Sequence, residues 1–174
     1  GRGLSRRFRK LVARAVRAHR PDVIHAASPD VIGLWASDIA REFGLPLVYE
    51  VRGLWHETSV ALRRIEAGSP VYEKMSATFV EALKRADAIV TLSETVKAEI
   101  ERSGISLDKV HLVPNGVDTD RFVPRDRPPD LARDLEIARD EVVIGYVGSL
   151  RSFEGLDLVL RAVRKLRDAG LPVK

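Results

Sequence analysis

Apolar residues follow two different spacings along the chain, and the alternation of these spacings predicts an α/β fold. Short apolar runs of strand length occupy residues 23–27, 47–51, 87–92, 110–113 and 142–147. The segments 31–43, 71–85, 94–103 and 156–169 instead repeat their apolar side chains at helical spacing. Strands that alternate with helices in this way predict a parallel sheet with right-handed crossovers. We therefore expect a parallel sheet wound with helices.

Glycines and a polar cap mark the ends of these helices. Gly44, Gly104 and Gly170 each follow a helical pattern, at the position where a left-handed residue ends a helix. Ser93 precedes another helix and has the side-chain oxygen of an N-cap. Residues 52–68 show no clean period. We expect this segment to be a ligand-binding loop that is partly helical over residues 58–67.

A charged, proline-rich stretch at residues 125–130 interrupts the pattern and reads as a linker. We expect residues 1–124 to form one domain that is incomplete at its start. Residues 125–140 would be the linker, and residues 141–174 the truncated start of a second domain. This last segment has one strand, one helix and the beginning of another strand, too little to cover both faces of a sheet. The missing initiator Met also suggests a piece of a longer protein.

The composition supports a folded protein and excludes several kinds of site. Of the 174 residues, 45% are hydrophobic and 31% are charged. The chain has no cysteine, which excludes disulfides, cysteine-ligated zinc and thiol catalysis and fits a reducing compartment. No apolar run approaches the ~20 residues that cross a bilayer. Residues 1–20 lack the apolar block of a signal peptide, so we expect a cytoplasmic protein.

The positive charge is concentrated at one end of the chain. The net charge is +4, and residues 1–20 hold eight basic residues and no acid, so the remaining residues carry a net charge of −4. The apolar residues of this segment recur at helical spacing, which predicts a basic amphipathic helix. Two interpretations are open: a solvated outer helix, which we favour, or a peripheral contact of residues 2–20 with an anionic membrane at the inner face. The segment has one aromatic residue, Phe8, and no nucleic-acid-reading motif, so we expect no nucleic-acid partner.

A turn follows the strand at residues 110–113, and the chain is organised around it. Pro114 cannot continue a central strand because it lacks an N–H group. Asn115 and Gly116 are the pair best able to adopt positive φ, so we expect the backbone to reverse tightly there. Asp118 is placed to accept hydrogen bonds from the backbone amides that follow. Open α/β sheets place their ligand loops at this end of a strand.

Polar residues at the ends of two other strands are candidates for chemistry. Arg52 directly follows a strand, and its guanidinium can pair with a phosphate or a carboxylate but cannot act as a base. Glu50 is its candidate partner, and a simple salt bridge between the two is the structural alternative. His25 can orient a hydroxyl or accept a proton, or it can be a satisfied core histidine. The four histidines are scattered without ligand spacing, so we expect no metal site.

The loop Val113-Pro114-Asn115-Gly116-Val117-Asp118, with Arg121-Phe122, resembles the loop that ends the N-terminal half of family-four retaining glycosyltransferases, which have the GT-B architecture. The stretches 86–93 and 144–150 flank it in the same order. Residues 49–55 (Tyr-Glu-Val-Arg-Gly-Leu-Trp) and 154–157 (Glu-Gly-Leu-Asp) resemble a subgroup of that family. The resemblance covers most of the chain from Pro21 onward. It implies a Rossmann-like parallel sheet, one GT-B half, and the opening βα unit of a second Rossmann-like domain.

The resemblance also assigns roles to residues. It implies Arg52 and His25 as catalytic residues and binding of substrate by Ser28, Glu50, Asn115 and Gly116. It places the donor's diphosphate against Gly148, Ser149 and Arg151, where small residues let phosphate approach the backbone. The chain departs from the family at several positions, and Arg52, which fits the subgroup's pattern, stands where many members have a His. Ala27 stands where the family often has a second His, and the family's Gly-Arg and Lys-Gly pairs are Gly148-Ser149 and Glu154-Gly155 here.

The implied activity is transfer of a sugar, with retention, from a nucleotide sugar to a hydroxyl of a sugar or lipid-linked acceptor, in cell-surface polysaccharide or glycolipid synthesis. No metal or other cofactor is expected. The acids that grip the donor would lie beyond Lys174, so this piece alone should be inactive. Two alternatives are open: a nucleotide-sugar epimerase of the same architecture and a non-catalytic binding module.

Overall fold

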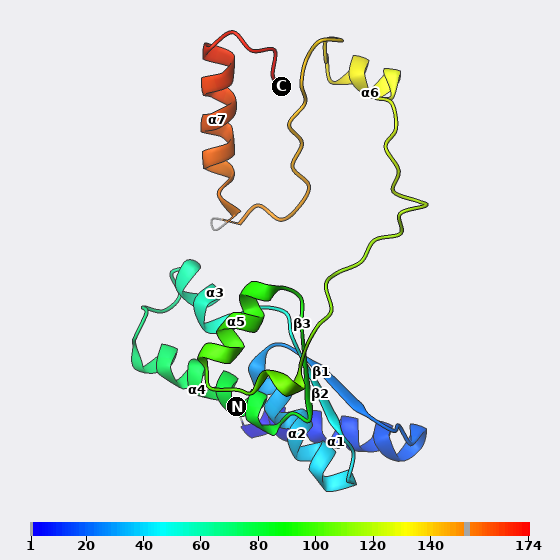
Figure 1. Cartoon of the computed structure of the whole chain (residues 1–174), viewed down its shortest axis with the longest axis vertical. Helices are drawn as coiled ribbons and strands as arrows, with labels where there is room; N and C mark the ends of the chain where they lie inside the picture. The colour runs from blue at the N-terminus through cyan, green and yellow to red at the C-terminus, as the bar shows by residue number, and fades with distance from the viewer. Residues whose placement is uncertain (1, 152–153) are drawn as a thin grey trace. The chain divides into compact units, whose positions relative to one another are not determined.

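The structure is a computed structural model that describes residues 2–151 and 154–174, with side chains from residue 5 onward (Figure 1). It divides into two compact units, Gly1–Gly116 and Val117–Lys174. Among the described residues, the first unit contains a four-stranded sheet and the second contains two α-helices.

The sheet of the first unit is parallel throughout. Its strands are β1 (Ile24–Ala27), β2 (Leu47–Val51), β3 (Ala88–Thr91) and β4 (Val110–Leu112), and they lie side by side in chain order. Ala27 pairs with Glu50 in the register, and Val51 pairs with Thr91. The carboxyl ends of neighbouring strands therefore meet at one edge of the sheet. The expectation of a Rossmann-like parallel α/β fold is confirmed.

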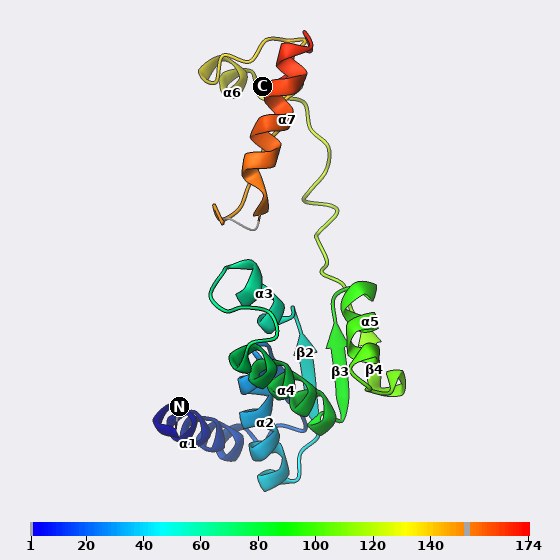
Figure 2. The same ribbon diagram turned by 90° about the vertical axis from the view of Figure 1, so that its left-hand side faces the viewer.

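The described residues of this unit form the α-helices α1 (Arg2–His19), α2 (Asp30–Phe43), α3 (Trp55–Ala61), α4 (Pro70–Arg85) and α5 (Glu94–Arg102). A 3₁₀ turn, η1 (Leu107–Lys109), leads into β4. Since every crossover steps to the next strand in the same direction, right-handed connections bring the crossover helices to the same face of the sheet. Figure 2 shows α2 and α4 side by side, and these two helices have the most extensive contact in the unit.

Alternating residues of β2 point to opposite faces of the sheet, one buried and one partly exposed. Leu47, Tyr49 and Val51 are buried under the helices, because successive side chains of a strand point to opposite faces. Val48 and Glu50 point to the other face and are partly exposed. Glu50 is therefore placed on the open face of the sheet, near its carboxyl edge.

The core of the first unit is one contiguous cluster that joins the strands to α2, α4 and α5. Phe79, Leu83 and Ile100 supply the helical side of it and are almost fully buried. The expected N-cap is confirmed: the Ser93 side chain accepts a hydrogen bond from the Val96 amide at 3.3 Å. Gly44 has φ 64°, so the expected left-handed end of α2 is also confirmed.

The irregular segment after β2 is helical earlier than the pattern predicts. The expected helix spans residues 58–67, whereas α3 spans Trp55–Ala61. The buried His56 anchors the first turn of α3, because its ring packs on Tyr72 and Phe79 of α4. Arg63 has φ 54°, a left-handed angle that a helix cannot contain. Because of these two features, α3 begins and ends closer to β2 along the chain than the pattern predicts.

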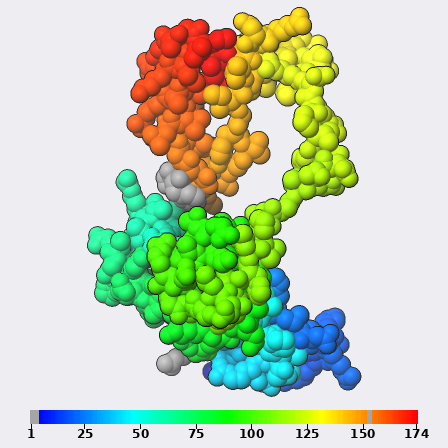
Figure 3. Space-filling model, in the orientation of Figure 1, coloured from blue at the N-terminus to red at the C-terminus, as the bar shows by residue number. Residues whose placement is uncertain are grey.

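The second unit contains α6 (Pro129–Asp134) and α7 (Leu156–Asp168). The expected strand at residues 142–147 is wrong, because the structure forms only a single parallel bridge between Val142 and Val173. Strand geometry needs a partner along its length, and among the described residues only 172–174 pair with this segment. Figure 3 shows open space between the segment and α7, and Val147 is fully exposed.

Candidate functional site

Two loops meet at the carboxyl edge of β1 and β2, and Ser28 joins them. The Ser28 backbone N–H donates to the Glu50 carbonyl at 3.0 Å, which extends the ladder one residue past β1. The Ser28 hydroxyl donates to the same carbonyl at 3.2 Å and accepts from the Arg52 N–H at 2.9 Å. The hydroxyl therefore fixes the backbone of Arg52 at the point where the chain leaves the sheet.

The Glu50 carboxylate lies between a histidine and an arginine. Its Oε2 is 3.1 Å from His25 Nε2, and its Oε1 is 3.0 Å from Arg52 Nε. The Glu50 side chain is 17% exposed, whereas those of His25 and Arg52 are 54% and 60% exposed. The interpretation of His25 as a buried core histidine is therefore wrong. The salt bridge between Glu50 and Arg52 exists, but it belongs to this larger cluster.

We call His25, Ser28, Glu50 and Arg52 the Glu50 cluster. A guanidinium has five N–H donors, and Glu50 occupies the Nε side of Arg52. Among the described residues, no other carboxylate lies within 4.0 Å of Arg52. The two terminal nitrogens thus face solvent at the edge of the sheet and can bind a phosphate or carboxylate. His25 adds a ring nitrogen that can contact a hydroxyl group.

A buried acid and tyrosine lie behind this cluster. The Tyr49 hydroxyl donates to Asp30 Oδ1 at 2.9 Å, and the two residues are 0% and 4% exposed. Burial raises the pKa of Asp30, and the Tyr49 hydroxyl and the charge of His56 partly offset this shift. Burial and the Asp30 charge raise the pKa of Tyr49. A Cβ at Gly33 would lie 2.8 Å from the Tyr49 ring, so only glycine leaves room for it.

Helix α3, which follows Arg52 in the chain, is held in place by packing and by a hydrogen bond to α4. His56 is 4% exposed, and its Nδ1 has no hydrogen-bond partner among the described residues. Glu57 accepts a hydrogen bond from the Tyr72 hydroxyl at 2.5 Å, which joins α3 to α4. The segment that follows Arg52 is therefore held by packing and by one charge-assisted bond.

The loop after β4 adopts a different turn from the expected one. Neither Asn115 nor Gly116 has positive φ, so the prediction of a left-handed reversal at this pair is wrong. Asp118 closes the turn instead, because its Oδ1 accepts from the backbone N–H groups of Asp120 and Arg121, each at 3.1 Å. That role of Asp118 was expected. Asn115 and Gly116 are exposed and make no described hydrogen bond to the Glu50 cluster.

A family model described as Glycosyltransferase Family 4 matches residues 1–121. The chain belongs to this family. It is 33% identical over 172 residues to a D-inositol 3-phosphate glycosyltransferase of Actinosynnema mirum, which covers 92% of this chain and 39% of that protein. It is 30% identical over 151 residues to a GDP-mannose-dependent alpha-mannosyltransferase of Mycobacterium tuberculosis, covering 86% of this chain and 37% of that protein. The chain thus spans about two fifths of the length of these relatives.

The fold also matches a solved structure. The crystal structure of Anabaena Alr3699/HepE in complex with UDP-glucose superposes with a TM-score of 0.57 at 14% identity. The match covers 95% of this chain and 50% of that chain. At this identity the likeness concerns the fold, and it agrees with the Rossmann-like reading of the sheet.

The resemblance to Glycosyltransferase Family 4 draws attention to the segment around Gly148 in the second unit. The Tyr146 hydroxyl donates to the Ser149 carbonyl at 2.9 Å, and a Cβ at Gly148 would lie 2.6 Å from the Tyr146 oxygen. The Arg151 N–H donates to the same carbonyl at 2.9 Å, and the residue is exposed. A side chain at residue 148 would thus force the Tyr146 ring to shift and would disturb this tight turn.

Sequence reasoning missed several residues of this family member. Asp30 begins α2, and its contact with Tyr49 depends on the packing of α2 on the sheet. Asp118 and Asp120 have Asp-x-Asp spacing, and the Asp120 N–H donates to Asp118 Oδ1 as part of the turn. In the described part of the chain, no group of three or more His, Cys, Asp or Glu is placed to hold a metal. None of the helices described there has the length and apolar character needed to span a membrane.

Proposed function

We propose that the full-length protein is a retaining glycosyltransferase. It would move a sugar from a nucleotide-sugar donor to an acceptor hydroxyl in cell-surface polysaccharide or glycolipid synthesis. The Glu50 cluster carries this proposal: one carboxylate holds an arginine and a histidine at the carboxyl edge of a parallel sheet, in a chain of Glycosyltransferase Family 4. The names of the two relatives, both sugar transferases, support the same chemistry.

Glu50 has a positioning role in this proposal. With its Oε1 on Arg52 Nε and its Oε2 near His25 Nε2, it orients both groups toward the open edge. Arg52 would stabilise the charge that develops on the leaving diphosphate, and His25 would contact the acceptor hydroxyl. Asn115 and Gly116, on the loop after β4, would add acceptor contacts. Catalysis of this kind depends mainly on positioning and on electrostatic stabilisation.

The second unit would contribute to the donor site. Gly148 and Ser149, which precede α7 in the chain, would offer backbone to the donor's diphosphate, and Arg151 would supply the positive charge for it. The partners in this proposal are a nucleotide sugar and a sugar or lipid-linked acceptor, without a metal or other cofactor. The bound UDP-glucose named for the Anabaena protein belongs to that protein and gives a first candidate donor for testing.

The test is product analysis with the full-length protein, labelled nucleotide sugars and acceptors carrying a free hydroxyl. Transfer of label to the acceptor, lost in Arg52→Ala with folding intact, supports the proposal. A new nucleotide sugar formed without any acceptor indicates an epimerase instead. Tight binding of sugar with no turnover, unchanged in Arg52→Ala, indicates a non-catalytic binding module.

A peripheral membrane contact is a second part of the proposal, and the packing of α1 shapes it. Ala13 and Val16 are buried, and the Phe8 ring lies 5.4 Å from the Trp35 ring of α2, so much of the apolar face of α1 is already packed, although Leu11 is 64% exposed. Contact at the inner face of a membrane would thus be mainly electrostatic, through exposed basic residues such as Lys10 and Arg14. Equal flotation with neutral and anionic liposomes would remove this part while leaving the transfer proposal intact.

A further inference from the structure

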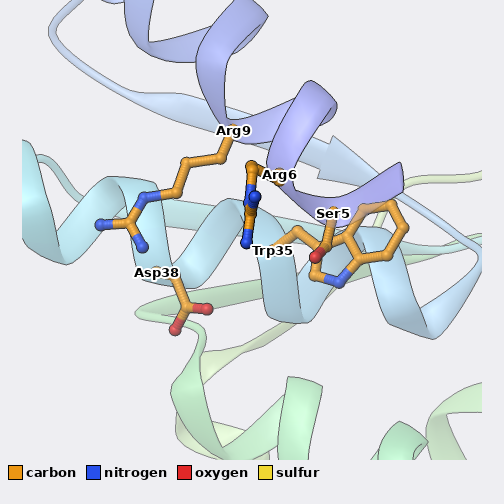
Figure 4. Close-up of a pocket in the computed structure, with 5 residues that line it drawn as sticks. All are labelled: Ser5, Arg6, Arg9, Trp35 and Asp38. Carbon is orange, nitrogen blue, oxygen red and sulfur yellow. The ribbon is translucent and has the colours of Figure 1, made fainter. Parts of the chain in front are cut away.

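A pocket lies between α1 and α2, and it shares no residue with the Glu50 cluster (Figure 4). Its volume is about 400 Å³, within the range of small-molecule sites. Figure 4 shows Arg6 between Arg9 and the Trp35 indole. The pocket is lined by Ser5, Arg6, Arg9, Trp35 and Asp38.

The acids beside this pocket are already neutralised. Asp38 Oδ1 is 2.9 Å from Arg41 and 3.2 Å from Arg85. Glu42 Oε2, one helical turn further along α2, is 2.7 Å from Arg9. The Glu42 contact also raises the pKa of Arg9, which is one of the pocket's two arginines. Carboxylates that each have arginine partners leave little negative charge to balance a further cation.

Arg6 is that further cation. Among the described residues, no carboxylate lies within 4.0 Å of its guanidinium, and it is exposed at the pocket. Lys10 and Arg14, which line the adjoining hollow along α1, also have no carboxylate in that range among those residues. The pocket therefore has a surplus of positive charge in a concave surface, where the field on an anion is stronger than on a flat one.

Trp35 gives the pocket an apolar wall beside this charge. Its indole is partly buried, and the Phe8 ring supports it at 5.4 Å with an interplanar angle of 49°. This contact holds the indole in place without a ligand. A wall of this kind accommodates the carbon skeleton of a small molecule, whereas a bare anion would leave it unused.

We propose that the pocket binds a phosphate ester, with the phosphate on Arg6 and the carbon skeleton on Trp35. Arginine suits this role because its planar donors match two phosphate oxygens at once. Arg9, held by Glu42, adds positive charge beside the same group. The ester group occurs both in soluble sugar or glycerol phosphates and in phospholipid headgroups. The site does not depend on the transfer reaction, and it can be tested in a protein that transfers no sugar.

Calorimetric titration of the full-length protein with glycerol 3-phosphate at low ionic strength tests the site. Arg6→Gln removes the proposed phosphate contact. Arg7→Gln is the matched control, because Arg7 is exposed on the same helix and does not line the pocket. We expect Arg6→Gln to weaken binding about tenfold or more and Arg7→Gln to weaken it less than about twofold. Circular dichroism would check that both variants keep their helix content.

Vesicles of phosphatidylcholine with phosphatidylglycerol distinguish the two sources of the ester. If the headgroup is the ligand, vesicle binding falls more in Arg6→Gln than in Arg7→Gln. If a soluble ester is the ligand, only the glycerol 3-phosphate titration separates the variants, and either result supports the site. Equal weakening by both substitutions in both titrations would reduce the effect to general charge attraction and overturn the proposal. So would the absence of binding by the wild-type protein to either probe.

Discussion

The buried hydrogen bond between Tyr49 and Asp30 gives a sharp prediction about stability. Tyr49→Phe removes the hydroxyl and keeps the ring, so it opens almost no cavity. The lost bond, 2.9 Å long, connects two residues that are 0% and 4% exposed. A hydrogen bond to a charged partner contributes about 1.5–3 kcal/mol, so we expect a loss of about 2 kcal/mol at pH 7.

Urea unfolding followed by tryptophan fluorescence measures this loss. The chain has two tryptophans, Trp35 and Trp55, and both lie in the first unit, so the signal reports on that unit. Tyr72→Phe is a matched control, because it also removes a tyrosine–carboxylate bond, to Glu57, but an exposed one. We expect the control to cost under ~1 kcal/mol, since exposed pairs contribute little.

The pH dependence of the stability loss in Tyr49→Phe distinguishes a hydrogen bond to a charged carboxylate from a packing effect. At pH 3 the Asp30 carboxyl is neutral, because burial raises its pKa above the usual value. The Tyr49→Phe loss should then shrink to about 1 kcal/mol, the contribution of a bond between neutral groups. A loss under ~0.5 kcal/mol at pH 7, or an equal loss at both pH values, would refute this reasoning.

Three further predictions follow from other contacts. Because the pKa of Asp30 is raised in the folded state, the folded protein binds the Asp30 proton more tightly than the unfolded chain does. The free energy of unfolding should therefore fall as pH rises from about 4 through the folded-state pKa of Asp30. Asp30→Asn should remove this pH dependence in urea unfolding. Lys109→Met should cost about 1–2 kcal/mol in the same assay, because the Lys109 Nζ donates to the carbonyls of Leu83 at 2.9 Å and Ala86 at 2.8 Å, where α4 ends. Gly148→Ala should weaken nucleotide-sugar binding by the full-length protein in calorimetry. The new Cβ would lie 2.6 Å from the Tyr146 oxygen, so the Tyr146 ring would have to shift and the turn would be disturbed. An affinity equal to that of the wild type would contradict this prediction.

The sequence predicts the elements of the first unit well, because each depends on its own residues. The strands and the long helices lie where the apolar spacing indicates. As expected, Ser93 precedes the first residue of α5 and Gly44 follows the last residue of α2. The expected strand at residues 142–147 fails for the opposite reason. A strand needs neighbours, and in the described part of the second unit only residues 172–174 pair with it.

The candidate site is only partly readable from the sequence. Ser28, Glu50 and Arg52 flank strand ends, and parallel pairing brings them together, so the sequence could predict their meeting. The position of His25 beside Glu50 depends on the face that each residue takes in the sheet, and its exposure was not evident. The contact of Asp30 with Tyr49 joins a helix to a strand 19 residues away, and no local pattern signals it.

The most direct test of the central claim is the anomeric configuration and rate of sugar transfer by the full-length protein and two variants. Arg52→Ala removes the arginine held by Glu50, and Arg102→Ala removes an exposed arginine paired with Glu99 at 2.6 Å on α5. We predict a product that keeps the donor's configuration, a rate lower by about 100-fold in Arg52→Ala, and an unchanged rate in Arg102→Ala. An inverted product would contradict retention, and equal rates in the two variants would contradict the role of the Glu50 cluster.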